Sequence, residues 1–162
     1  MKTVGIIAEY NPFHNGHAYQ IAEAKRITGA DYAVVVMSGD FVQRGEPAIF
    51  PKHLRAKMAL SEGASVVLEL PVYFSTGSAE YFAHGAVALL HSLGCIDALC
   101  FGSESGNIAD LQTIARILSE EPDDYKALLQ TCLRQGMSYP LARQTAFEDY
   151  THNNNLAQIL SE

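Results

Sequence analysis

The sequence has no tryptophan and little cysteine. Its three cysteines, Cys95, Cys100 and Cys132, are odd in number and form no CxxC pair, which argues against a disulfide framework and a zinc knuckle. We expect them to be reduced and buried. No apolar run approaches the roughly 18 residues of a membrane span, and Glu9 interrupts the first apolar run before a signal-peptide core could form. These absences predict a cytoplasmic protein with no membrane partner.

Basic residues are also few. The chain has 11 Lys and Arg against 18 Asp and Glu, which gives a formal net charge of -7. Coating nucleic acid by bulk electrostatics needs clustered positive charge, so any nucleic-acid contact must be local. One local cluster exists, formed by Arg44, Lys52, Arg55 and Lys57. It is either a solvated helix face or an anion-binding surface, in which Lys52 and Arg55 meet a triphosphate or RNA.

The order of elements predicts an α/β fold. At 162 residues, 48% of them hydrophobic, the chain can form one compact core, and we expect one domain over residues 1–162. Continuous apolar runs of strand length alternate with segments of helical spacing, which is typical of a parallel sheet covered on both faces. The predicted strands are residues 3–10, 31–39, 64–71 and 95–102, and the predicted helices between them are 17–29, 51–60 and 79–94.

After Gly106 the pattern is helical throughout, over residues 107–121, 123–136 and 138–150. Three asparagines at 153–155, which are good helix N-caps, precede a last helical pattern that stops after two turns. From this ending we expect a chain truncated at its C-terminus.

The stretch EYNPFHNGHAYQ, residues 9–20, places His14 and His17 where the first strand turns into a helix. Open parallel sheets bind ligands beyond the carboxyl ends of their strands, and a helix N-terminus favours an anion. Gly16 would let a phosphate approach the backbone, and both imidazoles would donate to it. A metal pair would need a third ligand, and no HExxH or cysteine partner lies nearby, so we predict no metal ligands. Simple turn hydrogen bonds are the remaining alternative.

Five segments together resemble one family. GIIAEYNPFHNGH, residues 5–17, contains HNGH as an HxGH element and resembles nucleotidyltransferases with a HIGH-type signature, and more closely the bacterial tRNA(Met) cytidine acetate ligase family. Further segments similar to that family are SGDFVQRGEPAIF at 38–50, KHLRAKMAL at 52–60, ELP at 69–71 and FGSE at 101–104.

The resemblance implies a Rossmann-like fold with strand order 3-2-1-4-5, in which a fifth strand is missing from this chain. It also implies a ligase that uses ATP, with Mg²⁺ on the nucleotide, to activate acetate as acetyl-adenylate. The acetyl group then passes to N4 of the wobble cytidine of elongator tRNA(Met). In that strand order the turn after strand one and FGSE after strand four flank the same crevice.

The resemblance and the residue chemistry together assign the site. The predicted catalytic residues are His14, His17, Asp40 and Arg44. The predicted nucleotide-binding residues are Ile7, Ala8, Glu9, Tyr10, Asn11, Pro12, Phe13, Asn15, Gly16, Gly102, Ser103, Asn153 and Asn154. Asp40 could equally be a helix or turn cap, and we expect Glu69 to form a structural ion pair. His84 and His91 are expected to be core or boundary histidines of the helix over 79–94.

Two other functions stay open at this point. One is adenylyl transfer to a phosphate monoester, which the histidine pair alone cannot distinguish from acetate activation, although SGDFVQRGEP at 38–47 matches the ligase family better. The other is a nucleotide-binding or RNA-interaction module without activity, because family members run further and carry a later basic motif that has no counterpart in this chain.

Overall fold

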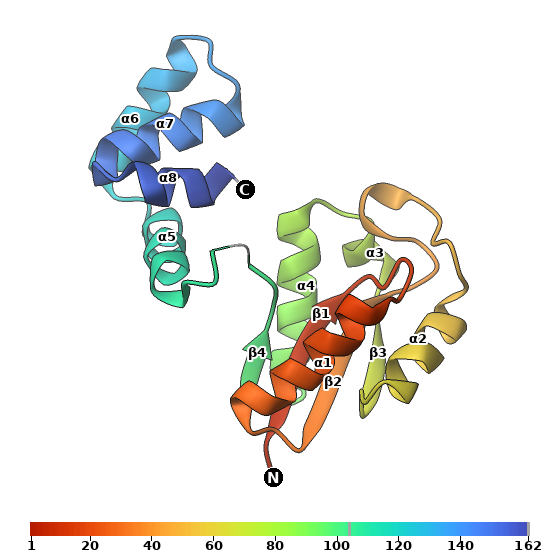
Figure 1. The fold of residues 1–162 in the computed structure, drawn as a ribbon. Coiled ribbons are helices and arrows are strands. Elements are labelled where there is room, and N and C mark those ends of the chain that lie inside the picture. The colour runs from red at the N-terminus through yellow and green to blue at the C-terminus, as the bar shows by residue number, and fades with distance from the viewer. Residues whose placement is uncertain (104, 162) are drawn as a thin grey trace. The chain divides into compact units, whose positions relative to one another are not determined.

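Val- and Ile-rich runs form the strands of a parallel sheet, because β-branched side chains pack well on a pleated surface. The computed structural model describes residues 1–103 and 105–161, so Glu104 of the FGSE segment and Glu162 lie outside the described residues. The strands are β1 Thr3–Ala8, β2 Tyr32–Ser38, β3 Val66–Leu70 and β4 Ala98–Cys100. Their order is β3-β2-β1-β4 and every pair is parallel (Figure 1). The predicted class and the order of these strands are confirmed.

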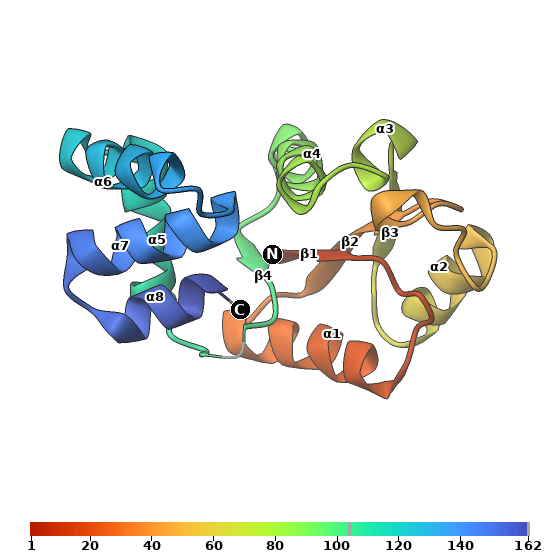
Figure 2. The same ribbon diagram turned by 90° about the horizontal axis from the view of Figure 1, so that it is seen from above.

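The helices that follow the strands cover both faces of the sheet. They are α1 Asn15–Thr28, the 3-10 helix η1 Gln43–Gly45, α2 Lys52–Ser61, α3 Val72–Ser75 and α4 Ala79–Ser92. Figure 2 shows α1 on one side of the sheet and α4 on the other. The short helices η1 and α3 were not predicted, because three or four residues are too few to show a helical period.

Two apolar clusters lie on the two faces of the sheet. On one face Val4 and Ile6 of β1 pack with Ile21 and Ala24 of α1, and Ala59 of α2 joins them. On the other face the cluster joins the sheet to α4 and contains Val34, Val36, Leu70, Ala86 and Leu90. The sheet is therefore buried from both sides, and its ligand-accessible parts are the strand ends and the loops beyond them.

The chain divides into two compact units, Met1–Gly102 and Ser103–Glu162. The second unit is helical, as predicted, with α5 Ile108–Glu120, α6 Asp123–Arg134, α7 Tyr139–Thr151 and α8 Asn154–Ser161. Its own core contains Tyr125 and Phe147. The expectation of one domain over residues 1–162 stays a prediction, since compact units of this kind can belong to one domain or to two. Among the described residues no helix is both long enough and apolar enough to span a bilayer.

Two groups of side chains lie elsewhere than expected. Cys132 is buried, but Cys95 is exposed in the loop before β4 and Cys100 is only partly covered on the edge strand. His84 and His91 of α4 are exposed, because the buried stripe of that helix is formed by its small and aliphatic residues. The prediction of burial was therefore wrong for Cys95, and His84 and His91 lie neither in the core nor at its boundary.

Candidate functional site

An open pocket of about 390 Å³ lies beyond the carboxyl end of β1. It is lined by the end of that strand, the turn after it and one face of α1. The lining residues are Ile7, Ala8, Glu9, Tyr10, Asn11, Pro12, His14, His17 and Gln20. The sequence predicted this region apart from Gln20, whose spacing of three from His17 on the helix was the available signal.

The side chains of His14 and His17 cap the start of α1. His14 is the N-cap, and its Nδ1 accepts a hydrogen bond from the Gly16 N–H at 3.1 Å. The Nδ1 of His17 accepts in return from the His14 N–H at 3.2 Å. This is the reciprocal arrangement of a capping box, with imidazoles in place of the usual hydroxyl and carboxylate. The helix was predicted to begin at His17, but α1 begins at Asn15, directly after its N-cap His14.

The two cap bonds fix the tautomer of both rings. A neutral imidazole has one nitrogen that accepts and one that donates. Because Nδ1 accepts in His14 and in His17, the proton of each neutral ring lies on Nε2. Among the described residues no hydrogen bond engages either Nε2, and both rings line the pocket. The site therefore offers two neutral N–H donors at a helix N-terminus, an arrangement suited to phosphate oxygens.

Neighbouring rings hold His17 in place. The His14 and His17 rings stack with centroids 3.7 Å apart, and the ring of Tyr10 meets His17 edge-on at 4.8 Å. Phe13 lies 5.6 Å from His17 and packs against the core. Burial lowers the pKa of His17 from its ordinary 6.5, and the charge of a protonated His14 lowers it further. His17 is thereby kept neutral over a wider range of pH.

The lowered pKa of His17 predicts a pH-dependent stability. Above pH 6.5, His17 is neutral in the folded and the unfolded chain, and its full contribution to stability is present. Below pH 6.5 the unfolded chain takes up a proton at His17 before the folded chain does, so the free energy of unfolding falls as the pH drops toward the folded pKa. Urea unfolding at about pH 5.5 and about pH 7.5 should show this slope. His17→Gln should flatten the slope, because a glutamine at this helix position still accepts the cap bond but does not titrate. An equal slope in the wild-type and His17→Gln proteins would show that His17 is not the source of the pH dependence.

Gly16 is required by the ring of His14. A Cβ added at this position would lie 3.0 Å from Cε1 and 3.1 Å from Nδ1 of His14. We therefore expect Gly16→Ala to displace that ring, break the cap bond and lower the free energy of unfolding by about 1 kcal/mol. The change in urea midpoint measures this. Gly102→Ala is the matched control for stability, because a Cβ there meets nothing within 4 Å, and a loss of similar size in both variants would contradict the explanation.

Side chains at the end of β1 also hold the loop between β2 and α2. Oε1 of Glu9 accepts from the Gln43 N–H at 2.8 Å, and Oδ1 of Asn11 accepts from the Ile49 N–H at 2.7 Å. The SGDFVQRGEPAIF segment is thus attached to the same turn that lines the pocket. For Glu9 and Asn11, the structure shows a role in holding this loop beside their predicted role in nucleotide binding.

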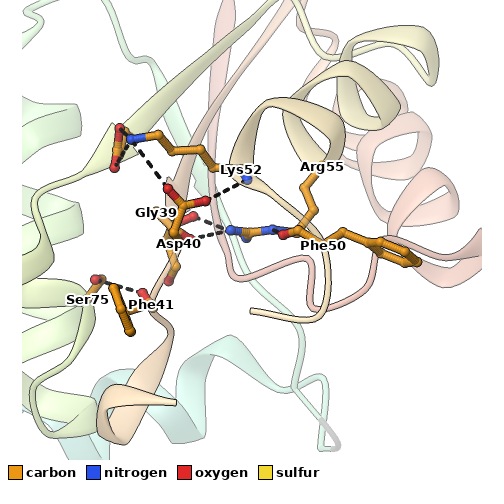
Figure 3. A network of polar contacts seen from close by, with 9 residues as sticks. Gly39, Asp40, Phe41, Phe50, Lys52, Arg55 and Ser75 are labelled. Atoms are coloured by element: carbon orange, nitrogen blue, oxygen red, sulfur yellow. Dashed lines mark hydrogen bonds and ion pairs between the residues drawn. The ribbon is translucent and has the colours of Figure 1, made fainter. Parts of the chain in front are cut away.

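Arg55 lies between the ends of β1 and β2 and contacts both. Figure 3 shows its guanidinium beside Gly39 and Phe50. Its side chain is fully buried. The guanidinium donates to the Glu9 carbonyl at 2.6 Å, to the Ser38 carbonyl at 3.1 Å, to the Phe50 carbonyl at 2.9 Å and to the Gly39 carbonyl. Desolvation lowers its pKa, and the charges of nearby carboxylates oppose that shift. The expectation that Arg55 meets a triphosphate or RNA was wrong, because backbone carbonyls already take its donors.

Asp40, Lys52 and Glu69 form an ion-pair cluster beside this network. The Nζ of Lys52 lies 2.8 and 2.7 Å from the two carboxylate oxygens of Glu69 and 3.9 Å from Asp40. Oδ1 of Asp40 also accepts from the Lys52 N–H at 2.9 Å, at the first residue of α2 (Figure 3). The hydrogen bond that Lys52 donates to the Glu69 carboxylate raises the pKa of Lys52. The structural ion pair expected for Glu69 is confirmed, and Asp40 has the capping contact that was the alternative to catalysis.

A family model described as HIGH Nucleotidyl Transferase matches residues 1–162. The chain belongs to the HIGH nucleotidyltransferase family. It is 56% identical over 162 residues to the tRNA(Met) cytidine acetate ligase of Acetivibrio thermocellus, covering 99% of this chain and 39% of that protein. It is 50% identical over 154 residues to the protein of the same name from Clostridium novyi, covering 95% of this chain and 38% of that protein.

A solved structure has the same fold. The crystal structure of Thermotoga maritima TmcAL bound with alpha-thio ATP matches with a TM-score of 0.95 and 46% identity, covering 100% of this chain and 40% of that chain. The chain thus spans about two fifths of the length of the relatives it matches. Membership of the HIGH nucleotidyltransferase family confirms what the HNGH element and the further motifs predicted, and the ligases are the proteins that this chain resembles.

Other residues predicted for the HIGH nucleotidyltransferase site lie outside the pocket lining or in the second unit. Arg44 is exposed on η1 with a left-handed φ of 67°. Gly102 is exposed beyond β4, which pairs with β1 as expected. In the second unit, Ser103 Oγ accepts from the Gly106 N–H, and Asn153 caps the start of α8 by accepting from the Asn155 and Leu156 N–H groups. The nucleotide-binding roles of these residues stay predictions.

Proposed function

We propose that the protein containing this chain activates acetate with ATP and transfers the acetyl group to N4 of the wobble cytidine of elongator tRNA(Met). Support comes from two relatives named tRNA(Met) cytidine acetate ligase and from a TmcAL structure that holds an ATP analogue. The observation that carries the proposal is the pair of Nε2–H donors at the start of α1, beyond the carboxyl end of β1. A cytoplasmic setting, where ATP and tRNA are found, is part of the proposal.

The first step requires donors for phosphate oxygens. A carboxylate oxygen of acetate attacks the α-phosphorus of ATP, the bond to the bridging oxygen breaks, and pyrophosphate leaves with its electron pair. Negative charge develops on the equatorial oxygens during this step, and fixed donors stabilise it. His14 and His17 are proposed to supply such donors, while Ile7 to Gly16 hold the nucleotide, which arrives with Mg²⁺ on its phosphates.

The second step moves the acetyl group. The N4 amine of cytidine attacks the carbonyl carbon of acetyl-adenylate, the bond to the phosphate oxygen breaks, AMP leaves, and the amine loses a proton. Asp40 and Arg44 are proposed to act on the acyl or phosphate side, where an arginine can bind an anion with a planar fork. The predicted nucleotide-binding roles of Gly102, Ser103, Asn153 and Asn154 are also part of the proposal.

Isotope exchange tests the proposal. The protein containing this chain should exchange labelled pyrophosphate into ATP only when acetate is present, and acetyl transfer should appear when the tRNA is added. If ATP binds normally but acetate produces no exchange, the ligase function is wrong. Pantetheine and nicotinate nucleotide phosphates should then be tried as acceptors of the adenylyl group. Binding without any transfer would leave a nucleotide-binding module.

A further inference from the structure

We propose that Tyr10 is a positioning residue whose aromatic ring, and not its hydroxyl group, holds the imidazole of His17 at the nucleotide site. The inference deepens the proposed function and rests on it for its kinetic consequences. Its structural part rests on the contacts among Tyr10, Phe13 and His17 alone. Tyr10 would act through His17, without itself contacting the reacting atoms.

The backbone at Tyr10 turns its ring inward. Tyr10 has a φ of 52°, in the left-handed region that residues with a Cβ seldom adopt. It lies two residues beyond the end of β1 at Ala8, where the chain leaves the sheet. The side chain is 1% exposed and belongs to the same apolar cluster as Ile21 of α1. An unfavourable backbone conformation is thus retained at a position where it places a large ring in the core.

The buried ring of Tyr10 contacts the ring of His17. It lies 4.8 Å from the His17 centroid at an interplanar angle of 60°, and 4.8 Å from Phe13 at 74°. His14 stacks on His17 at 3.7 Å. His17 is thus confined by ring contacts and by its cap bond to the His14 N–H. Among the described residues, His14 and Tyr10 are the titratable side chains in ring contact with His17, and Glu9 lines the same pocket.

The hydroxyl group of Tyr10 makes no hydrogen bond among the described residues. Its oxygen is buried, and burial raises the pKa of the phenol well above its usual range. A buried and unpaired hydroxyl is unfavourable for folding. Removing it should therefore leave the position of His17 unchanged, whereas removing the ring should free the imidazole to move.

Two variants in the full protein separate the ring from the hydroxyl. Tyr10→Phe keeps the ring, and Tyr10→Leu removes it. In NMR spectra that correlate imidazole nitrogens with carbon-bound protons, Tyr10→Phe should keep the Nε2–H tautomer and the lowered pKa of His17. Tyr10→Leu should populate both tautomers and bring the pKa of His17 back toward 6.5. Tyr19→Leu is the matched control, because Tyr19 is 68% exposed on α1, the helix that contains His17.

Kinetics supply the second measurement. Tyr10→Leu should lower kcat for acetate-dependent exchange by roughly 10- to 100-fold with a smaller change in the KM for ATP, because a misplaced donor affects the transition state most. Tyr10→Phe should keep the wild-type rate. If Tyr10→Leu does not fold, Tyr10→Met takes its place, because an unbranched and flexible side chain without a ring can adapt to the core.

The outcomes decide between the inference and the proposed function. A variant without the ring that leaves the tautomer and titration of His17 unchanged overturns the inference, and so does a Tyr10→Phe protein as impaired as Tyr10→Leu. If the wild-type protein shows no acetate-dependent exchange, the proposed function fails, while the NMR measurement still decides whether Tyr10 holds His17.

Discussion

Replacing His17 by alanine should lower the rate of acetate-dependent pyrophosphate exchange by about 10²-fold or more, because one fixed donor to the developing charge is lost. The protein should remain folded. His17 also accepts the cap bond from the His14 N–H, so its loss should cost about 1 kcal/mol of unfolding free energy. Exchange rates per folded molecule and urea unfolding curves measure the two effects separately.

His17→Gln refines this experiment. A glutamine can accept the cap bond with its amide oxygen at this helix position. Its amide N–H groups do not occupy the place of the imidazole Nε2–H, so the variant should keep most of the stability and lose most of the activity. His53→Ala is the matched control, since His53 is exposed on α2. If His17→Ala is less stable but the exchange rate per folded molecule is unchanged, His17 has a structural role in the turn and no role in catalysis.

Replacing Arg55 by methionine should lower the unfolding free energy by about 3 to 5 kcal/mol, because buried carbonyls at the ends of β1 and β2 lose their donors. The affected carbonyls belong to Glu9, Ser38, Gly39 and Phe50. Arg55→Lys should restore only part of the loss, since an ammonium cannot reproduce the planar fork. Urea unfolding gives the value for each variant.

Lys57→Met is the control for Arg55, because Lys57 is exposed on the same helix. It should change the unfolding free energy by less than about 0.5 kcal/mol. An Arg55→Met protein within that same margin would show that water or movement of the loop satisfies the carbonyls. The explanation for the buried guanidinium would then be wrong.

The sequence predicted the sheet and the histidine site because both follow from local patterns. Continuous apolar runs mark buried parallel strands, and HNGH between a strand and a helix marks a helix N-terminus. The contacts of Asp40 and Glu69 were predicted in part. A cap was expected for Asp40 and an ion pair for Glu69, but Lys52 was not predicted as their shared partner.

The role of Arg55 could not be predicted in this way. Lys52, His53 and Lys57 lie within three residues of it in the sequence, and such a cluster is typical of a solvated helix face. Its partners are carbonyls of residues 9, 38, 39 and 50, which come together only when the strands pair. The left-handed φ also lies on Tyr10 and not on a glycine or on Asn11, which follows it. The sequence does not mark this position, because the ring that is buried there meets its partners only in the folded core.

The reciprocal cap limits the kind of catalysis that the two histidines can perform. In each neutral ring Nε2 already carries the proton, and Nδ1 is occupied by a backbone N–H of the first turn. A further proton on either ring would have to displace the backbone N–H that its Nδ1 accepts. His14 and His17 are thus poor proton shuttles, and a reaction at this site that needs a general base must find it in another residue or in the substrate.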